Sequence, residues 1–138
     1  MRVLVSVLLS FLSSLAVAEA VDWREWSPAV FAEAREEGRL VLLDLTAEWC
    51  RFCKKMDAVT YRDAEVVSAI GRDYVPVRAD EKDHPDLAAR YADQGRPLTV
   101  IFDADGRELI ARRGYLEPQW MLWLLQAVAA DPESAAHR

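Results

Sequence analysis

Short apolar runs alternate with amphipathic stretches along most of the chain, and glycine, proline, serine and aspartate residues separate them. A short, nearly continuous apolar run is typical of a strand covered on both faces, whereas apolar residues at spacings of three and four are typical of a helix. The pattern predicts strands over 40–46, 74–79, 98–102 and 108–112. It predicts helices between Ser27 and Gly38, over 48–59, from Asp63 to Gly71, over 85–91 and over 118–130.

Capping and turn residues support these boundaries. Ser27-Pro28 places a serine at a helix N-cap and a proline at the first helical position, and Gly38 can end that helix. Asp103-Ala104-Asp105-Gly106 predicts a hairpin turn between the last two strands. Strands joined by helices, then a hairpin and a last helix, predict an α/β fold in which a mixed sheet of about four to five strands lies between layers of helices.

The N-terminal segment differs from the rest of the chain. Arg2 is followed by an apolar run that reaches Val17, and Ala16-Val17-Ala18 fits the small-x-small site at which signal peptides are cleaved. We therefore expect a signal peptide over 1–18 and a periplasmic or secreted protein, with an uncleaved N-terminal anchor as the alternative. The remainder, 19–138, has 120 residues (138 − 18), which suits a single domain.

Composition narrows the function. The 138-residue chain has a formal net charge of −6, which argues against nucleic acid as a partner because binding it needs a basic face. The only two cysteines lie in Trp49-Cys50-Arg51-Phe52-Cys53-Lys54, with the spacing Cys-x-x-Cys. A disulfide across two residues closes a very small loop and removes little entropy from the unfolded chain. The spacing therefore favours a redox-active disulfide over a structural one.

The predicted helix places Cys50 where a thiolate is stabilised. Unpaired backbone N–H groups and the positive end of the helix dipole favour an anion at a helix start, and Arg51, Lys54 and Lys55 add positive charge nearby. Because the thiolate is the attacking species, we assign Cys50 as the nucleophile that forms a mixed disulfide with a partner. Cys53, one helical turn later, is the resolving thiol.

Two other classes of function stay open. Two sulfurs suit a soft ion such as Cu(I), which would make the protein a metallochaperone, but neither histidine is near the cysteines in the sequence. The second alternative is a non-catalytic binding module with a passive disulfide. Our expectation for the leading interpretation is that the protein has no resident metal and no cofactor.

Asp44 is unusual because it lies inside a predicted apolar strand, six positions before Cys50. A carboxylate in such a place is unfavourable unless it is paired or functional. Asp44 is therefore a candidate functional residue; the alternative is an aspartate on an edge strand that faces solvent.

Four separated features occur in a fixed order. They are the segment Leu42 to Trp49 that leads into Cys50-Arg51-Phe52-Cys53-Lys54, then Gly95-Arg96-Pro97, then Asp105-Gly106, and finally Gly114. Together they resemble a thioredoxin-fold protein, from about Trp26 to Ala130: the strand before the active-site helix, the cis-proline loop, the hairpin and the glycine beyond it.

Two branches of that fold are similar to different parts of the chain. Cys50 to Val67 is similar to the periplasmic thioredoxin-like domain of the transmembrane thiol-disulfide interchange reductase. Three other stretches resemble the thioredoxin-like domain of the spermatogenesis-associated family: Trp26–Ala34, Ala79–Asp86 and Gly95–Val100. That second family usually has a histidine after each cysteine, where this chain has Arg51 and Lys54, so we carry over its fold but not its activity.

The resemblance implies roles for individual residues. It implies that Asp44 moves a proton to or from Cys53, and that Pro97 forms a cis peptide bond beside the cysteines. It also implies that the backbone of Arg96 pairs with an extended partner peptide. Trp49, next to Cys50, is a candidate partner contact, with aromatic packing beside the helix as the alternative. We expect a protein thiol-disulfide oxidoreductase, a reductase rather than an oxidase. Its partners would be protein thiols and disulfides and a redox partner protein, which can be membrane-bound.

Some residues depart from the thioredoxin pattern. Arg51-Phe52 replaces Gly-Pro between the cysteines, so the reduction potential is not carried over. Pro76 is expected where many thioredoxins place a lysine beside the buried acid. Arg96 is expected to add positive charge near the thiols. The apolar run Trp120 to Leu125 in the last helix is interpreted mainly as core, with a docking surface for a protein or a membrane as the alternative.

Overall fold

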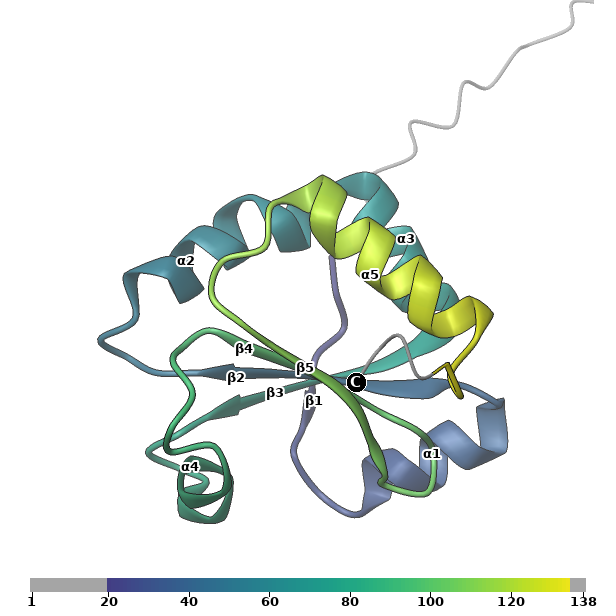
Figure 1. The fold of residues 1–138 in the computed structure, drawn as a ribbon, viewed down its shortest axis with the longest axis horizontal. Helices are drawn as coiled ribbons and strands as arrows, with labels where there is room; N and C mark the ends of the chain where they lie inside the picture. Colours follow the sequence, from purple (N-terminus) through teal and green to yellow (C-terminus); the bar gives the residue numbers. More distant parts are fainter. Residues whose placement is uncertain (1–19, 135–138) are drawn as a thin grey trace, which may run out of the picture.

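The computed structural model describes residues 20–134, so the expected signal peptide over 1–18 lies outside the described residues. The strands are β1 (Arg24–Glu25), β2 (Leu40–Thr46), β3 (Tyr74–Asp80), β4 (Leu98–Phe102) and β5 (Glu108–Arg113). The helices are α1 (Ala29–Glu37), α2 (Arg51–Ala58), the 3₁₀ helix η1 (Thr60–Arg62), α3 (Ala64–Asp73), α4 (Pro85–Arg90) and α5 (Pro118–Ala130). One sheet with the strand order β1-β3-β2-β4-β5 runs through the middle, and helices cover both of its faces (Figure 1).

The central strand is β2, because it pairs with β3 in parallel and with β4 in antiparallel orientation. β1 adds to the far side of β3 in parallel, and β5 adds to β4 as the second strand of a hairpin. This mixed sheet between helices confirms the predicted α/β architecture. Its register places Arg78 of β3 and Thr99 of β4 on either side of Asp44, so three polar residues lie side by side within the sheet.

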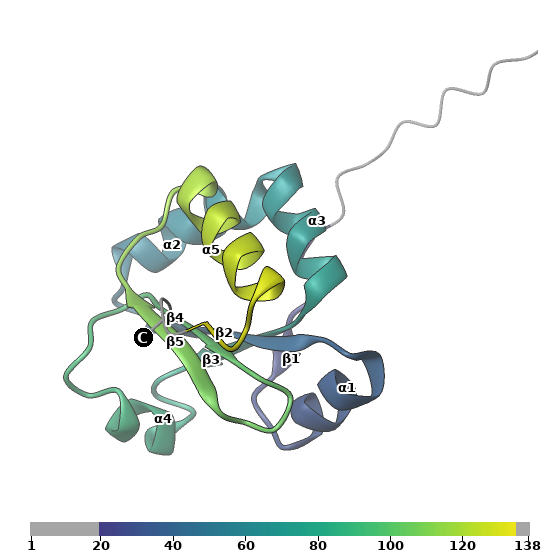
Figure 2. The same cartoon turned by 45° about the vertical axis from the view of Figure 1, so that its right-hand side comes forward.

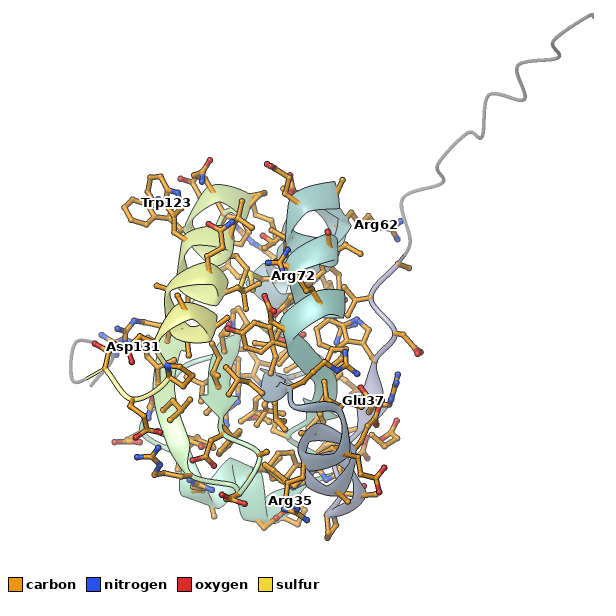
Figure 3. All side chains as sticks on the ribbon, turned by 90° about the vertical axis from the view of Figure 1, so that its right-hand side faces the viewer. Arg35, Glu37, Arg62, Arg72, Trp123 and Asp131 are labelled. Carbon is orange, nitrogen blue, oxygen red and sulfur yellow. A yellow bond between two sulfur atoms is a disulfide. The ribbon has the colours of Figure 1, made fainter. Side chains whose placement is uncertain are left out.

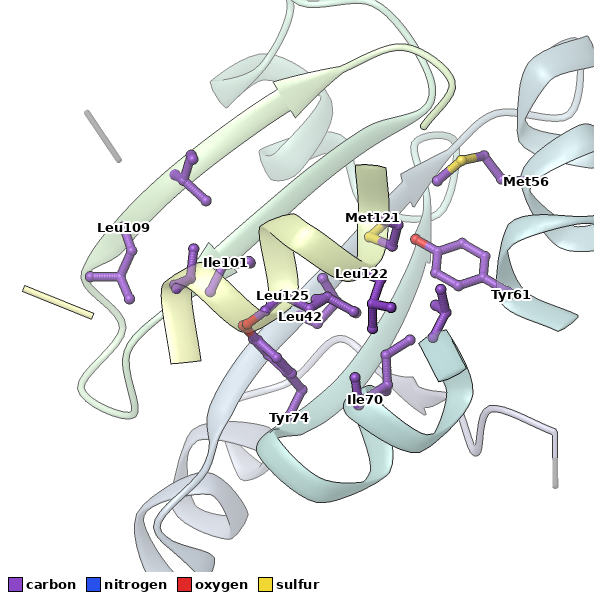
Figure 4. Packing of buried hydrophobic residues seen from close by; sticks show 14 residues of the cluster. Leu42, Met56, Tyr61, Ile70, Tyr74, Ile101, Leu109, Met121, Leu122 and Leu125 are labelled. Carbon is purple, nitrogen blue, oxygen red and sulfur yellow. The ribbon is translucent and has the colours of Figure 1, made fainter. Parts of the chain in front are cut away.

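The helices form two layers. Figures 1 and 2 show α2, α3 and α5 on one face of the sheet, and α1 and α4 on the other. Side chains of a strand alternate between the two faces. Leu42 belongs to the core under α5, with Leu125 (Figure 4), whereas Leu43 belongs to the opposite core with Val30 of α1 and Leu87 of α4. Burial of both faces explains why the apolar run of β2 is nearly continuous.

Several predicted boundaries are confirmed, since β2 covers 40–46, β4 covers 98–102 and α5 covers 118–130. Gly38 ends α1 with a φ of 64°, a left-handed conformation that glycine adopts without strain. Asp63 caps α3 by accepting hydrogen bonds from two backbone N–H groups of its first turn. Local capping chemistry therefore decides where these helices begin and end.

Other boundaries differ from the prediction. The helix expected over 48–59 begins at Arg51, because Cys50 is its N-cap and the residues before it form a turn. The first helix has Pro28 rather than Ser27 at its N-cap. β1 and η1 were not predicted, since elements of two and three residues show no periodicity.

The apolar run in α5 is partly core and partly surface. Met121 and Leu125 are fully buried, whereas Trp120 and Trp123 are 57% and 51% exposed. The two indoles contact each other edge to face, with 5.0 Å between ring centroids, and Figure 3 shows Trp123 on the outer side of the helix. The run is therefore amphipathic, with two large aromatic side chains on its outer side.

Truncation of Leu42 tests the core beneath α5. Leu42→Ala should lower the free energy of unfolding by about 3 kcal/mol, because it removes a fully buried side chain and leaves a cavity. Leu40→Ala, on the same strand and face but only partly buried, is the matched control and should lower it by about 1 kcal/mol. Denaturant unfolding measures both; equal losses would contradict this description of the core.

Candidate functional site

The two cysteines form a disulfide where β2 leads into α2. Their Cα atoms are 5.3 Å apart, within the usual range for a disulfide. Cys50 and Cys53 are 2% and 6% exposed. Both residues are thus buried, and exposure alone does not distinguish the sulfur that reacts with a partner.

Hydrogen bonding does distinguish the two sulfurs. Cys50 is the N-cap of α2, with an extended backbone (φ −82°, ψ 102°), and its Sγ accepts a hydrogen bond from the backbone N–H of Cys53 (3.1 Å). A donor in that place stabilises a thiolate more than a neutral thiol. Cys50 is therefore the cysteine whose thiolate this geometry favours, and its role as nucleophile stays a prediction.

Asp44 is 1% exposed and lies on the central strand, so the alternative of a solvent-facing edge residue is wrong. One carboxylate oxygen, Oδ2, accepts a hydrogen bond from Arg78 Nε (3.0 Å) and lies 2.9 Å from Arg78 Nη2. The other, Oδ1, is buried without a hydrogen-bond partner among the described residues. Asp44 is thus paired on one side and free to accept a proton on the other.

Arg78 is held by three further contacts. Its Nη2 forms an ion pair with Asp57 of α2. Its guanidinium lies 4.2 Å from the ring centroid of Trp23 and 5.7 Å from that of Tyr61, distances at which a cation is attracted to an aromatic face. Arg78 therefore connects the buried carboxylate with α2, η1 and the segment before β1.

The residue of β3 directly opposite the buried acid is Arg78, not Pro76. The parallel register of β2 and β3 places Pro76 opposite Leu42 and Arg78 opposite Asp44. Arg78 was not among the predicted site residues, although its position in the sequence carries a signal. Burying a single arginine in an apolar strand is as unfavourable as burying a single aspartate, because both charges lose water. An ion pair between the two offsets this cost.

Burial raises the pKa of Asp44 from 3.8 to about 6, although the positive charge and hydrogen bond of Arg78 act in the opposite direction. The hydroxyls of Tyr61 and Thr99 are also buried without a hydrogen-bond partner in residues 20–134. Burial, and secondarily the charge of Asp44, raises the pKa of Tyr61 well above its ordinary value. A carboxyl group in such a setting can exchange a proton near neutral pH.

The loop before β4 lies against the last part of β5. The peptide bond between Arg96 and Pro97 is cis, and the Pro97 carbonyl accepts a hydrogen bond from the Gly114 backbone N–H (2.8 Å). The Arg96 side chain is only 4% exposed, donates to the backbone carbonyls of Tyr91, Gln94 and Gly95, and lies 3.1 Å from the Glu81 carboxylate. The positive charge expected at Arg96 is therefore paired with the Glu81 carboxylate.

Glu81 joins two loops that border the disulfide. One carboxylate oxygen accepts a hydrogen bond from Trp49 Nε1 (3.0 Å), and the other pairs with Arg96. Trp49 is 70% exposed, so most of its ring faces solvent beside Cys50. Sequence reasoning missed Glu81 because it lies 32 positions from Trp49, inside a charged segment that is typical of a solvated loop.

No group of three or more His, Cys, Asp or Glu side chains within residues 20–134 is arranged to hold a metal ion. In the same part of the chain, every helix is too short or too polar to cross a membrane.

Solved structures establish the thioredoxin-like fold. The solution structure of a thioredoxin from Thermus thermophilus superposes with a TM-score of 0.74 and 21% identity, covering 86% of this chain and 94% of that chain. A DsbH oxidoreductase gives a TM-score of 0.69 and 18% identity, covering 94% and 96%. The C-terminal domain of Neisseria meningitidis DsbD, in the reduced form, gives a TM-score of 0.61 and 23% identity, covering 72% of this chain and 90% of that chain.

A family model, Thioredox_DsbH, described as a protein of unknown function (DUF255), matches residues 4–122, and the chain belongs to this family. Among named relatives, the thiol:disulfide interchange protein DsbD of Ralstonia nicotianae is 40% identical over 83 residues, 57% of this chain and 14% of the relative. DsbD of Yersinia enterocolitica is 31% identical over 123 residues, 85% of this chain and 21% of the relative. The chain thus spans about a fifth or less of these relatives.

The family and the fold together define a thioredoxin-like thiol-disulfide oxidoreductase domain, homologous to part of DsbD, with a redox-active Cys-x-x-Cys pair.

The raised pKa of Asp44 has a consequence for stability. A carboxyl that binds its proton more tightly in the folded state stabilises the fold when protonated, and this contribution is lost as the pH rises from about 4 through 6. Asp44→Asn should match the wild type near pH 3.5 and exceed its free energy of unfolding by up to about 3 kcal/mol above pH 7. Chemical denaturation across this range measures the difference; a difference independent of pH would contradict the burial argument.

Proposed function

We propose that the protein is an exported reductase that exchanges disulfides with protein partners through Cys50 and Cys53. The observation that carries the proposal is the disulfide at the N-cap of α2, with a backbone N–H directed at the Cys50 sulfur. Homology to DsbD, named a thiol:disulfide interchange protein, supports exchange with proteins. The apolar N-terminal segment supports export.

The exchange proceeds in two displacements. In the dithiol form, the Cys50 thiolate attacks one sulfur of the partner disulfide; a mixed disulfide forms, and the second partner sulfur leaves as a thiolate that takes up a proton. Cys53 then loses its proton and attacks the Cys50 sulfur. The Cys50–Cys53 bond forms and the second thiolate of the partner leaves. The disulfide partner gains two electrons and two protons. A dithiol of a second, redox partner protein later supplies two electrons and two protons to Cys50 and Cys53.

Asp44 serves as the proton acceptor for Cys53. The carboxylate lies on the strand that leads into the active-site helix, and its Oδ1 has no other hydrogen bond among the described residues. Its pKa of about 6 leaves it mostly ionised at neutral pH yet more basic than an ordinary aspartate. Arg78 remains on Oδ2 and holds the carboxylate in place when the proton moves.

Partner segments bind along the cis-proline loop. The Arg96 side chain turns inward to Glu81, which leaves its backbone as the group that pairs with an extended peptide, as a strand is added to a sheet. Trp49, exposed beside Cys50 and held by Glu81, contacts the partner from the other side. Pro97 fixes the direction of the loop between these two contacts.

Cysteine variants test the exchange. The reduced wild-type protein should reduce insulin disulfides and Cys50→Ser should lose this activity, because the remaining thiol, Cys53, lacks the N-cap position and the backbone N–H that stabilise the Cys50 thiolate. Cys53→Ala should accumulate mixed disulfides with partners, since the resolving step is missing. Retention of full activity by Cys50→Ser would sink the proposal.

The direction of electron flow is measured in the same protein by equilibration with glutathione buffers. A reductase should have a reduction potential near that of thioredoxin, about −270 mV, whereas a value near −120 mV would make the protein an oxidant and contradict the reductase assignment.

A pH-rate profile tests Asp44. In single-turnover reactions, Asp44→Asn should slow release of the reduced partner at pH 7 on the order of tenfold or more, and should remove the inflection near pH 6. Asp57→Asn is the matched control, because it removes an exposed carboxylate that pairs with the same arginine. An unchanged profile in Asp44→Asn would refute the proton-transfer role.

A further inference from the structure

The cations of the described chain fall into two groups. Eight of the 15 arginine and lysine side chains in residues 20–134 form ion pairs. The other seven have no ion-pair partner within that range: Arg35, Arg51, Lys54, Lys55, Arg62, Arg112 and Arg113. In a chain of net charge −6, carboxylates are plentiful, so the position of the unpaired cations is informative.

Five of these seven lie next to the redox site. Arg51, Lys54 and Lys55 lie on α2 directly after Cys50, and Arg112 and Arg113 end β5. All five are exposed. We name these five residues the cationic rim.

Contacts with Tyr115 link α2 to the segment that follows β5. Phe52 of α2 lies 6.4 Å from Tyr115 between ring centroids, and Lys55 Nζ lies 4.4 Å from the centroid of the same tyrosine. Tyr115 follows Gly114, whose backbone N–H bonds to Pro97. Arg113 pairs in register with Leu98, the residue after that proline. The rim therefore borders the disulfide and the cis-proline loop on the side of α2 and β5.

The opposite side of the disulfide has a different charge. There Lys82 pairs with Glu48 and Arg96 pairs with Glu81, and further carboxylates follow at 83 and 86. On the rim side, Glu117 at the N-cap of α5 is a neighbouring carboxylate. A partner segment that crosses the site thus meets unpaired positive charge on one side only.

Phe52 adds an apolar contact to this charge. It is 49% exposed, and the Arg51 guanidinium lies 5.8 Å from its ring centroid. Exposed aromatic side chains next to arginine are typical of protein-binding surfaces. Unpaired charges around a site steer partners of opposite charge and raise their rate of encounter.

We propose that the cationic rim binds acidic side chains beside the reacting disulfide of a protein partner, so that the enzyme prefers partners whose cysteine lies in an acidic segment. The inference rests on the proposed exchange of disulfides with proteins, and it adds the chemical class of the partner.

Three disulfide-linked peptide dimers test it, identical except that the residues flanking cysteine are glutamate, glutamine or lysine. The second-order rate at which each oxidises the reduced protein is followed by tryptophan fluorescence. At low ionic strength the glutamate peptide should react about tenfold faster than the lysine peptide. The ratio should approach one in about 0.5 M salt, because the screening length falls.

A pair of double variants isolates the rim. Arg112→Gln/Arg113→Gln should lower the glutamate-to-lysine rate ratio about threefold. Arg35→Gln/Arg62→Gln changes the net charge equally and should leave the ratio unaltered. Figure 3 looks at the side of the fold turned away from the start of α2 and shows Arg35 and Arg62 there. Neither control residue belongs to the site.

The outcomes separate the two proposals. Equal rates for the three peptides, or equal effects of the two double variants on the glutamate-to-lysine rate ratio, would overturn the proposal that the cationic rim selects acidic partners. Absence of exchange with every peptide overturns the proposed function. In that case, a binding titration with cysteine-free peptides tests the role of the cationic rim independently of exchange. Tighter binding of the glutamate peptide, weakened by Arg112→Gln/Arg113→Gln but not by the control, supports it; equal binding of the glutamate and lysine peptides overturns it.

Discussion

The ion pair between the buried Asp44 and the partly buried Arg78 is the constraint on which the rest of the site depends. The carboxylate of Asp44 lies on the central strand, where the sheet and its helices exclude water. The parallel pairing of β2 and β3 places the positive charge of Arg78 next to it. The balance between desolvation and this partner places the Asp44 pKa near neutrality. Without the parallel register, Asp44 would lack its partner.

Arg78 extends that constraint outward. Its stacking on Trp23 and its ion pair with Asp57 link the centre of the sheet to the segment before β1 and to the active-site helix. Glu81 performs a similar function nearer the surface, where it connects Trp49 with Arg96. The site is therefore assembled from two charged side chains that follow one another on β3 and its loop, each tying together segments distant in the sequence.

The sequence was sufficient for the features that depend on local pattern. Continuous apolar runs located β2 and β4, Gly38 and Asp63 marked helix ends, and a carboxylate inside an apolar run identified Asp44. It failed where the answer depends on register or on a distant partner. The position of Arg78 requires the pairing of two strands, and the neutralised charge of Arg96 requires a glutamate from another loop.

β5 forms a free edge of the sheet in the described chain. An open edge strand presents unpaired backbone groups that can recruit another chain and so lead to aggregation. The exposed charges of Glu108, Arg112 and Arg113 lie along this edge, and such charges oppose pairing between copies of the same protein. The charges along β5 thus oppose self-association at this edge, whereas the proposed pairing with a partner peptide takes place at a different backbone segment, the cis-proline loop.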